Sequence, residues 1–272
     1  MIKRIKGFLF FLPLISHRQL VLSLSVREIE TKNANTYLGW LWGFLGPLIQ
    51  IAMYTFVFAF VFNVRWSTDA QASTATSALK IFLGMTIFNL FAECIGQSPM
   101  LVLSRVAFVK KVVFPLEILS YVTLFTALRN FAINLVLFIL CYAIFIGTPH
   151  VTSLFMLLLL VPLVLTALGV MWFVASLTIF LRDMRNVVPI AITILMFMSP
   201  IFYPASMLEN RYGWLLEFNF IGWIVEECRK VAFDGAMPNF VHLSLLIVFT
   251  SAIASLGYFW FMKTKKGFAD VL

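Results

Sequence analysis

Long runs of apolar residues constrain this chain more than any other feature of its sequence. Residues 130–181 contain no Asp, Glu, Lys or Arg. Hydrophobic residues make up 62% of the chain and charged residues 12%, whereas ordinary globular domains are about 45–50% apolar and about 25% charged. So few charges cannot cover the surface of a soluble fold of this size. The chain is therefore expected to lie in a membrane.

The apolar runs predict helices rather than a barrel. A helix needs about 20 mainly apolar residues to cross the hydrocarbon core, and its backbone groups bond internally. Barrel strands alternate apolar and polar residues, which these runs do not do. The sequence GTPH at residues 147–150 is expected to form a tight turn between two spans. We predict an all-α integral membrane fold with six transmembrane helices, at residues 38–63, 79–98, 117–146, 152–180, 187–203 and 240–262.

The basic residues predict the orientation of these spans. Fourteen of the twenty Lys and Arg residues flank the spans on one side, and five lie on the other side. Short loops rich in Lys and Arg usually stay in the cytoplasm. We therefore expect a multi-pass protein with both termini cytoplasmic. The net charge of +8 is attributed to this topology and to contact with anionic membrane lipid, so no nucleic acid partner is expected.

Two segments outside the spans have a distinct pattern. Ile15, Leu22, Val26 and Ile29 recur at helical spacing, which predicts an interfacial helix on the membrane surface, or alternatively a solvated helix that packs on its neighbours. The basic and then apolar start of the chain resembles a signal peptide, but no small-residue cleavage site follows, so we expect it to be retained. The aromatic-rich external segment is predicted to be an amphipathic helical hairpin between spans five and six, or alternatively a loop that caps the bundle.

These observations predict two regions, with boundaries that follow the apolar runs. They are an N-terminal cytoplasmic and interfacial segment at 1–37, and a six-span transmembrane domain at 38–272 with the external segment at 204–239 and a cytoplasmic tail at 263–272.

The sequence offers little catalytic chemistry. It contains no Gly-Lys pair, and therefore no nucleotide-binding loop of the Gly-Lys-Ser/Thr type. Cys94, Cys141 and Cys228 are isolated, and the three His residues are scattered, so neither a metal site nor a catalytic triad is expected. We expect a chain that is not an enzyme and that binds no cofactor itself.

Two charged residues fall within predicted spans. Glu93 lies in the second span and Arg129 in the third, and ionisable groups at membrane depth are expensive and often functional. We expect them either to pair or to face a wet interior. The alternative is that each contacts a backbone carbonyl or reaches toward the membrane surface.

Aromatic residues offer a second candidate surface. Tyr54, Phe58 and Phe62 recur every four residues and therefore share one face of the first span, while Trp40 lies where an interfacial belt is expected. Such a stripe is more often helix packing. The functional interpretation is a channel surface that contacts sugar rings.

Several segments resemble one family, the type-2 ABC exporter permeases. The string LGWLWGFLGP at 38–47 resembles the entry to their first span, and VKKVVFPLEIL at 109–119 resembles their cytoplasmic loop before the third span. RDMRN at 182–186, followed by MSPIFYP at 198–204, resembles the fifth-span region. The ending FADVL at 268–272 is similar to the branch that exports polysaccharides, especially O-antigen permeases. Where members of the family commonly carry Asn-Pro before the last external helix, this chain has Asn219 followed by Phe220.

The resemblance implies a half-transporter. A second copy of the chain would complete a channel, and two separate ATP-binding subunits would hold ATP and Mg and hydrolyse the nucleotide. The cargo would be an undecaprenyl pyrophosphate-linked glycan, exported across a bacterial inner membrane in lipopolysaccharide biosynthesis. Alternatives are a teichoic acid or capsule exporter permease and, in a different class, an integral-membrane transferase. The implied contacts with the ATP-binding subunit are Arg27, Glu28, Arg105, Phe108, Lys110, Lys111 and Phe114.

Overall fold

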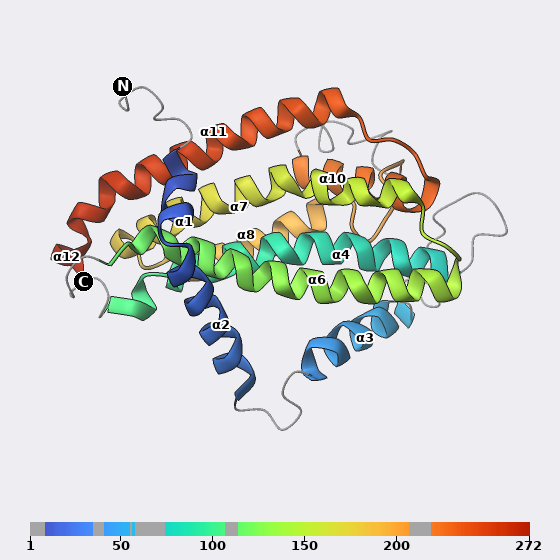
Figure 1. Cartoon of the computed structure of the whole chain (residues 1–272), viewed down its shortest axis with the longest axis horizontal. Coiled ribbons are helices and arrows are strands. Elements are labelled where there is room, and N and C mark those ends of the chain that lie inside the picture. Colours follow the sequence, from blue (N-terminus) through green and yellow to red (C-terminus); the bar gives the residue numbers. More distant parts are fainter. Residues whose placement is uncertain (1–8, 35–40, 55, 58–73, 107–113, 207–218) are drawn as a thin grey trace.

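The computed structural model describes residues 9–34, 41–54, 56–57, 74–106, 114–206 and 219–272 of the chain. Within these ranges the chain is helical and contains no strand. Long helices lie side by side with roughly parallel axes, and shorter ones cross them (Figure 1). The all-α prediction is therefore confirmed for the described residues.

Four helices are long and apolar enough to cross a membrane. They span Ala75–Met100, Leu116–Phe145, Val151–Phe180 and Phe240–Val271. Their α-helical parts are α4 (Thr74–Gln97), α6 (Leu119–Phe145), α7 (Phe155–Phe180) and α11 (Phe240–Thr264). They match four of the six predicted spans to within a few residues at most ends, although the last continues well past residue 262. Hydropathy alone was sufficient to find them.

The two remaining predicted spans are not confirmed as full spans in the described residues. For the first, α3 (Trp42–Tyr54) is the described helix, and most of the rest of 38–63 lies outside the described residues. For the fifth, α8 (Met184–Met198) has 15 residues, about 22 Å at the rise of an α-helix, against a hydrocarbon core of about 30 Å. It ends before residue 203 because Pro200 forces the preceding Ser199 into an extended conformation, with ψ 142°.

Short elements connect these helices. At the basic end they are η2 (Leu9–Phe11), α1 (Leu12–Ser16), α2 (Arg18–Ala34), η5 (Ser98–Met100), η6 (Leu103–Arg105), η7 (Leu116–Ile118), η10 (Lys265–Gly267) and α12 (Phe268–Val271). At the opposite end they are η8 (Val151–Leu154), α10 (Phe220–Arg229) and a π-helical turn, η9 (Lys230–Asp234). The basic end carries Arg105, Arg182, Arg185, Lys263, Lys265 and Lys266, and the opposite end carries Lys80, Arg229 and Lys230.

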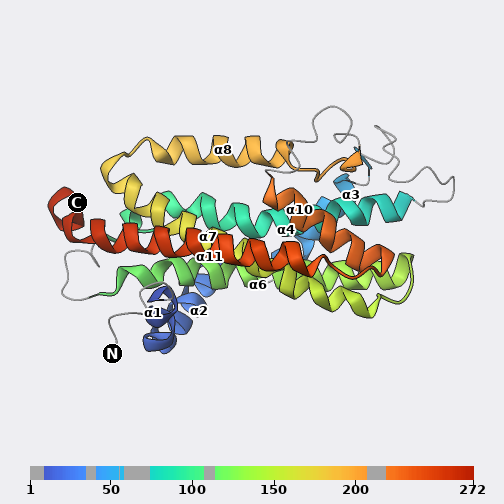
Figure 2. The same ribbon diagram turned by 90° about the horizontal axis from the view of Figure 1, so that it is seen from above.

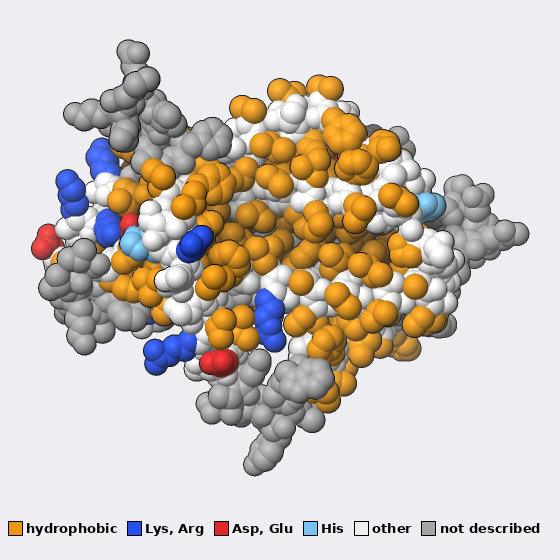
Figure 3. All heavy atoms as spheres, viewed as in Figure 1, with side chains coloured by type: hydrophobic (Ala, Val, Ile, Leu, Met, Phe, Trp, Pro, Cys, Tyr) orange, Lys and Arg blue, Asp and Glu red, His pale blue; other side chains and the backbone are white. Residues whose placement is uncertain are grey.

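The two ends differ in the way that the charge distribution predicts. In Figure 3 most of the Lys and Arg side chains lie toward one end, and apolar side chains form a broad face over much of the remaining surface in this view. The first and last described helices, α1 and α12, both lie near the basic end (Figures 1 and 2). This arrangement fits a multi-pass membrane protein whose described ends share one side.

The predicted turn at residues 147–150 is confirmed. Helix α6 ends at Phe145, and the amides of Ile146 and Gly147 both donate to the carbonyl oxygen of Tyr142. Gly147 has φ 133°, a conformation that residues with a side chain rarely adopt. His150 then begins the next helix in an extended conformation. A glycine at this position therefore allows the chain to reverse its direction between two long helices.

The external segment packs on the bundle. Helix α10 contacts α4 and α7, and it buries Ile221, Ile224, Val225 and Cys228. Residues 207–218 lie outside the described residues, so the predicted hairpin has one described helix and stays a prediction. The difference at Asn219 has a structural role: its side chain accepts a hydrogen bond from the amide of Gly222 at 3.0 Å, and so caps α10.

Candidate functional site: the basic end, the intramembrane polar cluster and the opposite-end pocket

At the basic end, an ion pair connects two segments that the resemblance implied as contacts with the ATP-binding subunit. Arg105 Nη2 donates to Glu28 Oε2 at 2.9 Å, and the two side chains are 27% and 18% exposed. Glu28 lies on α2 and Arg105 ends η6, so this ion pair fastens α2 to the loop that follows α4. Phe114 is half-buried and packs against the hydrophobic core, and Arg27 is exposed. Phe108, Lys110 and Lys111 lie outside the described residues.

A second network at this end includes residues that were not singled out. Lys265 Nζ donates to the Glu117 carboxylate at 2.7 Å, and the indole nitrogen of the fully buried Trp172 donates to the Glu117 backbone oxygen at 3.1 Å. Tyr121 donates to the carbonyl oxygen of Phe10. The network therefore ties both ends of the described chain to α6 and α7. Glu117 belongs to the string VKKVVFPLEIL. A carboxylate between apolar residues there is the sequence signal that could have pointed to this network.

The intramembrane cluster centres on Glu93. Asn130 Nδ2 donates to both carboxylate oxygens of Glu93, at 2.9 and 3.0 Å, and Gln97 Nε2 donates to one of them at 3.3 Å. Arg129 is half-buried and makes no hydrogen bond or ion pair with Glu93 in the described part of the chain. Glu93 therefore bonds to Asn130 and not to Arg129, the partner that was expected. Adjacent residues of a helix point about 100° apart, so when Asn130 faces Glu93, Arg129 points elsewhere.

This bonding pattern has a testable consequence. Asn130→Leu should lower thermal stability in detergent, because it removes the amide nitrogen that donates to both oxygens of the Glu93 carboxylate. Glu93→Gln should be tolerated better, because its amide oxygen still accepts from Asn130. In a double-mutant cycle, Glu93→Leu combined with Asn130→Leu should recover much of the loss, since both polar partners are then removed. Strict additivity of the two changes would argue against direct coupling of this pair.

Only part of the aromatic stripe is described. Tyr54 is buried, accepts a hydrogen bond from Gln50 at 3.0 Å, and packs edge to face against Phe202 with ring centroids 5.9 Å apart. In the single chain its described contacts are therefore packing contacts between α3 and the segment after α8. Trp40, Phe58 and Phe62 lie outside the described residues, so the channel role of the stripe stays a prediction.

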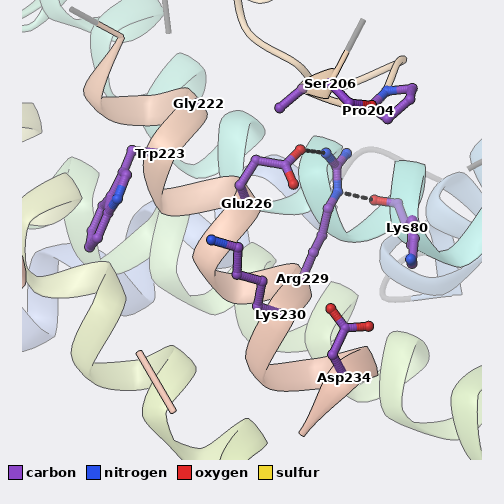
Figure 4. A pocket seen from close by; sticks show the side chains of 10 residues that line it. Lys80, Pro204, Ser206, Gly222, Trp223, Glu226, Arg229, Lys230 and Asp234 are labelled. Carbon is purple, nitrogen blue, oxygen red and sulfur yellow. Dashed lines mark hydrogen bonds and ion pairs between the residues drawn. The ribbon is translucent and has the colours of Figure 1, made fainter. Parts of the chain in front are cut away.

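A pocket of about 380 Å³ opens at the opposite end of the bundle. Lys80 of α4, residues 204–206, and side chains of α10 and η9 line it, and they come from segments far apart in the sequence (Figure 4). Trp223 stacks on His242, with ring centroids 4.4 Å apart. Lys80 and Asp234 bring opposite charges to the wall. The pocket therefore offers polar, charged and aromatic surface together.

Arg229 organises this end of the molecule. Its side chain is 4% exposed, and Nη1 donates to the Pro200 carbonyl oxygen at 2.6 Å and to the Glu226 carboxylate at 2.7 Å. Nη2 donates to the Ile201 carbonyl oxygen at 2.7 Å, and Nε donates to that of Lys80 at 3.1 Å (Figure 4). Burial lowers the pKa of Arg229, and the neighbouring Glu226 opposes that shift. One guanidinium thus joins α4, the segment after α8, and α10.

Sequence reasoning counted Arg229 only as a charge on one side of the membrane. The signal that could have found it is the pattern EECRK at residues 226–230, where charged residues stand in a segment of apolar helix. In the described part of the chain, no group of three or more His, Cys, Asp or Glu side chains could hold a metal ion. The described side chains at the opposite end hold segments of the chain together and line a polar pocket.

Comparisons with known proteins agree with this picture. Residues 19–233 match the model of a protein family described as "ABC-2 type transporter". The chain is 20% identical over 254 residues to an "O-antigen export system permease protein RfbA" of Klebsiella pneumoniae, covering 93% of this chain and 95% of that protein. It is 23% identical over 261 residues to the protein of the same description in Myxococcus xanthus, covering 94% and 96%. With a family model matched over most of its length and helices that fit a membrane permease, the chain belongs to the ABC-2 type transporter family.

Proposed function

We propose that this chain is the channel-forming transmembrane subunit of an ATP-driven exporter of lipid-linked polysaccharide of the O-antigen type. It would move the glycan from the cytoplasmic to the outer face of a bacterial inner membrane. The observation that carries the proposal is that relatives described as O-antigen export permeases align with this chain over nearly the whole of both sequences. An alignment of that extent relates the complete bundle, not a shared fragment.

The energy source would be a separate subunit. The sequence has no Gly-Lys pair with which to build a nucleotide-binding loop, so two ATP-binding subunits would supply ATP and Mg. The Glu28–Arg105 ion pair supports a docking site at the basic end, because it makes α2 and the loop after α4 one mechanical unit. A push on that loop would then be transmitted to both segments.

The path for the glycan would lie between two copies of the chain. Glu93, Gln97 and Arg129 are half-buried in a single copy although they belong to candidate membrane spans. Polar groups within a span face a wet cavity or another protein surface, since exposure to lipid tails is costly. A second copy facing this cluster would enclose a polar path. Weak and repeated contacts suit a long polymer, which must enter but also leave.

The basic-end ion pair provides a test of the proposed coupling. Arg105→Glu places two carboxylates together, and should reduce both co-purification of an ATP-binding subunit and the amount of surface glycan in a strain that lacks the native gene. A partly exposed ion pair contributes only about 0–1 kcal/mol, so the variant should stay folded. Quantitative mass spectrometry of the purified complex and gel analysis of extracted lipopolysaccharide measure the two effects.

Two controls make this test specific. The charge-swapped double variant Glu28→Arg with Arg105→Glu should recover part of the loss. Lys263→Glu reverses an exposed charge at the same end and should have a smaller effect. If deletion of the gene leaves surface glycan unchanged, the chain does not export it. If the wild-type chain purifies intact without any ATP-binding subunit, the proposed energy source is wrong.

A further inference from the structure

A second cavity lies between α6 and α7 near the opposite end of the bundle. It has a volume of about 300 Å³, and every residue that lines it is described. Phe131, Leu135 and Phe138 of α6 form one wall, and Met156 and Leu160 of α7 form the other. Ala232 of the π-helical turn η9 lies at its edge. Apart from Tyr142, His150 and Ser153, the lining is apolar.

The walls of this cavity are held firmly. Thr152 donates to the backbone oxygen of Val231 at 2.7 Å, which ties η9 to the start of the α7 segment. Phe233 packs on Phe138 and Tyr142, with ring centroids 6.0 and 5.4 Å apart. The cavity is therefore a feature of packed secondary structure and not a gap beside a loose segment.

The cavity lies between two candidate membrane spans, beside apolar side chains that are exposed in the single chain. Ile139 and Leu140 of α6 are 44% and 53% exposed, and Leu157 and Leu158 of α7 are 60% and 40% exposed. Both helices are candidate membrane spans, so these exposed apolar side chains stand where lipid tails are the surrounding solvent. In Figure 3 apolar side chains form a broad face across the bundle.

The cavity could be empty, filled with water or filled with hydrocarbon, and the first two states are unfavourable. An empty void of this size would deprive its apolar lining of dispersion contacts. Water is disfavoured, because a buried water needs two to four polar partners and nearly all of the lining is apolar. Hydrocarbon remains, and in a bilayer the abundant mobile hydrocarbon at this depth is the acyl chain of a phospholipid.

We infer that the α6–α7 cavity binds one acyl chain of a membrane phospholipid, whose headgroup lies near His150. His150 and Ser153 are at the end of the cavity next to the turn at Gly147, where the helices reach the membrane surface. Lipid tails are as apolar as leucine, so retention of the chain depends on packing rather than on removal from water. A bound chain would also press against Ala232, and thereby brace the turn that carries Lys230 and Asp234 of the other pocket.

Photolabelling tests this inference directly. The purified protein is reconstituted in nanodiscs of phosphatidylglycerol that carries a diazirine in one acyl chain, and the labelled peptides are mapped by mass spectrometry. Labelling of residues 135–160 should exceed that of the exposed lipid-facing residues Leu245 and Val248 of α11 several-fold. Equal labelling of the two regions would show ordinary lipid contact and would overturn the inference.

Matched variants make the result specific. Ile139→Trp and Leu157→Trp each place a large side chain in the cavity from its exposed rim, and should reduce labelling there. Leu140→Trp and Leu158→Trp change neighbouring exposed residues outside the cavity, and should not. Unchanged labelling in the first pair contradicts the inference. So does spontaneous disulfide formation between two copies of a Leu157→Cys variant, or displacement of the label by substoichiometric polyprenyl phosphate, because a second copy or a carrier lipid would then be the occupant.

Discussion

Gly257→Ala is expected to lower the thermal stability of this protein more than any other single methyl addition in its bundle. Gly257 of α11 faces Gly169 of α7, and these two helices form the most extensive helix pair in the described structure. A Cβ atom at Gly257 would collide with the carbonyl oxygen of Gly169 and lie 2.8 Å from its Cα. Both obstacles are backbone atoms, so no side-chain rotation can relieve the clash.

The same surface explains why the pair is so close. The buried face of α11 includes Thr250, Ala254 and Gly257, and small residues let membrane helices approach until their backbones touch. A Cβ at Gly169 would in turn lie 2.7 Å from the carbonyl oxygen of Ile253. Overpacking of a core typically costs about 1–3 kcal/mol, and a rigid backbone obstacle places this change at the upper end.

Thermal unfolding in detergent, followed by the loss of monodisperse protein on a sizing column, measures the effect. Gly257→Leu should fail to yield folded protein. Gly96→Ala is the matched control, because its Cβ would meet only Ile192 at an ordinary 3.6 Å. If Gly257→Ala and Gly96→Ala unfold at the same temperature, α7 and α11 are not packed backbone to backbone in the membrane.

The second large effect is expected from Arg229→Ala. Removal of this buried side chain leaves the carbonyl oxygens of Lys80, Pro200 and Ile201 without their guanidinium donor. It also removes the positive charge that pairs with the Glu226 carboxylate. Loss of one partner of a buried ion pair typically costs about 3–5 kcal/mol. Helix α10 and the segment after α8 should then separate from α4, with loss of stability and of export.

Two comparisons isolate the role of the guanidinium. Arg229→Lys should retain the charge but not the planar set of donors, and should recover only part of the stability. Lys230→Ala removes a positive charge from the same turn, but that side chain is 55% exposed, so its effect should be smaller. Gly84→Ala should act in the same direction as Arg229→Ala, because its Cβ would lie 2.6 Å from Arg229 Nη2. Equal stability of Arg229→Ala and Lys230→Ala would show that the network contributes nothing.

Some predictions followed directly from local composition. The four described spans and the turn at Gly147 were found from sequence because their signals are local. A long apolar run indicates a span, and a glycine with a proline nearby indicates a turn, whatever the rest of the fold. The predicted fifth span at 187–203 is not confirmed as a full span. Helix α8 ends at Met198, because Pro200 holds Ser199 in an extended conformation, and a count of apolar residues does not include that effect. The resemblance to exporter permeases, which rested on short strings, agrees with the family match over residues 19–233.

Other features needed the tertiary structure. Glu93 was recognised as unusual, but its partner Asn130 was not, since the choice between adjacent residues depends on how α4 and α6 are rotated about their axes. In helices that are apolar nearly all round, such as α7, no polar stripe reveals that rotation. The network of Arg229 was hidden for a further reason, because its acceptors are backbone oxygens, which every sequence has.

By itself, the sequence determined that this chain is a helical membrane protein, where its long spans lie, and which ends of those spans are basic. Each of these features depends on the composition of a contiguous segment. A long enough apolar segment can cross the bilayer, and the basic residues beside it set its orientation. Only the tertiary structure decided that Gly257 meets Gly169, that Arg229 joins three segments, that Glu28 pairs with Arg105, and that α6 and α7 line a cavity of about 300 Å³. Those contacts depend on helix rotation and register, which distant residues set together.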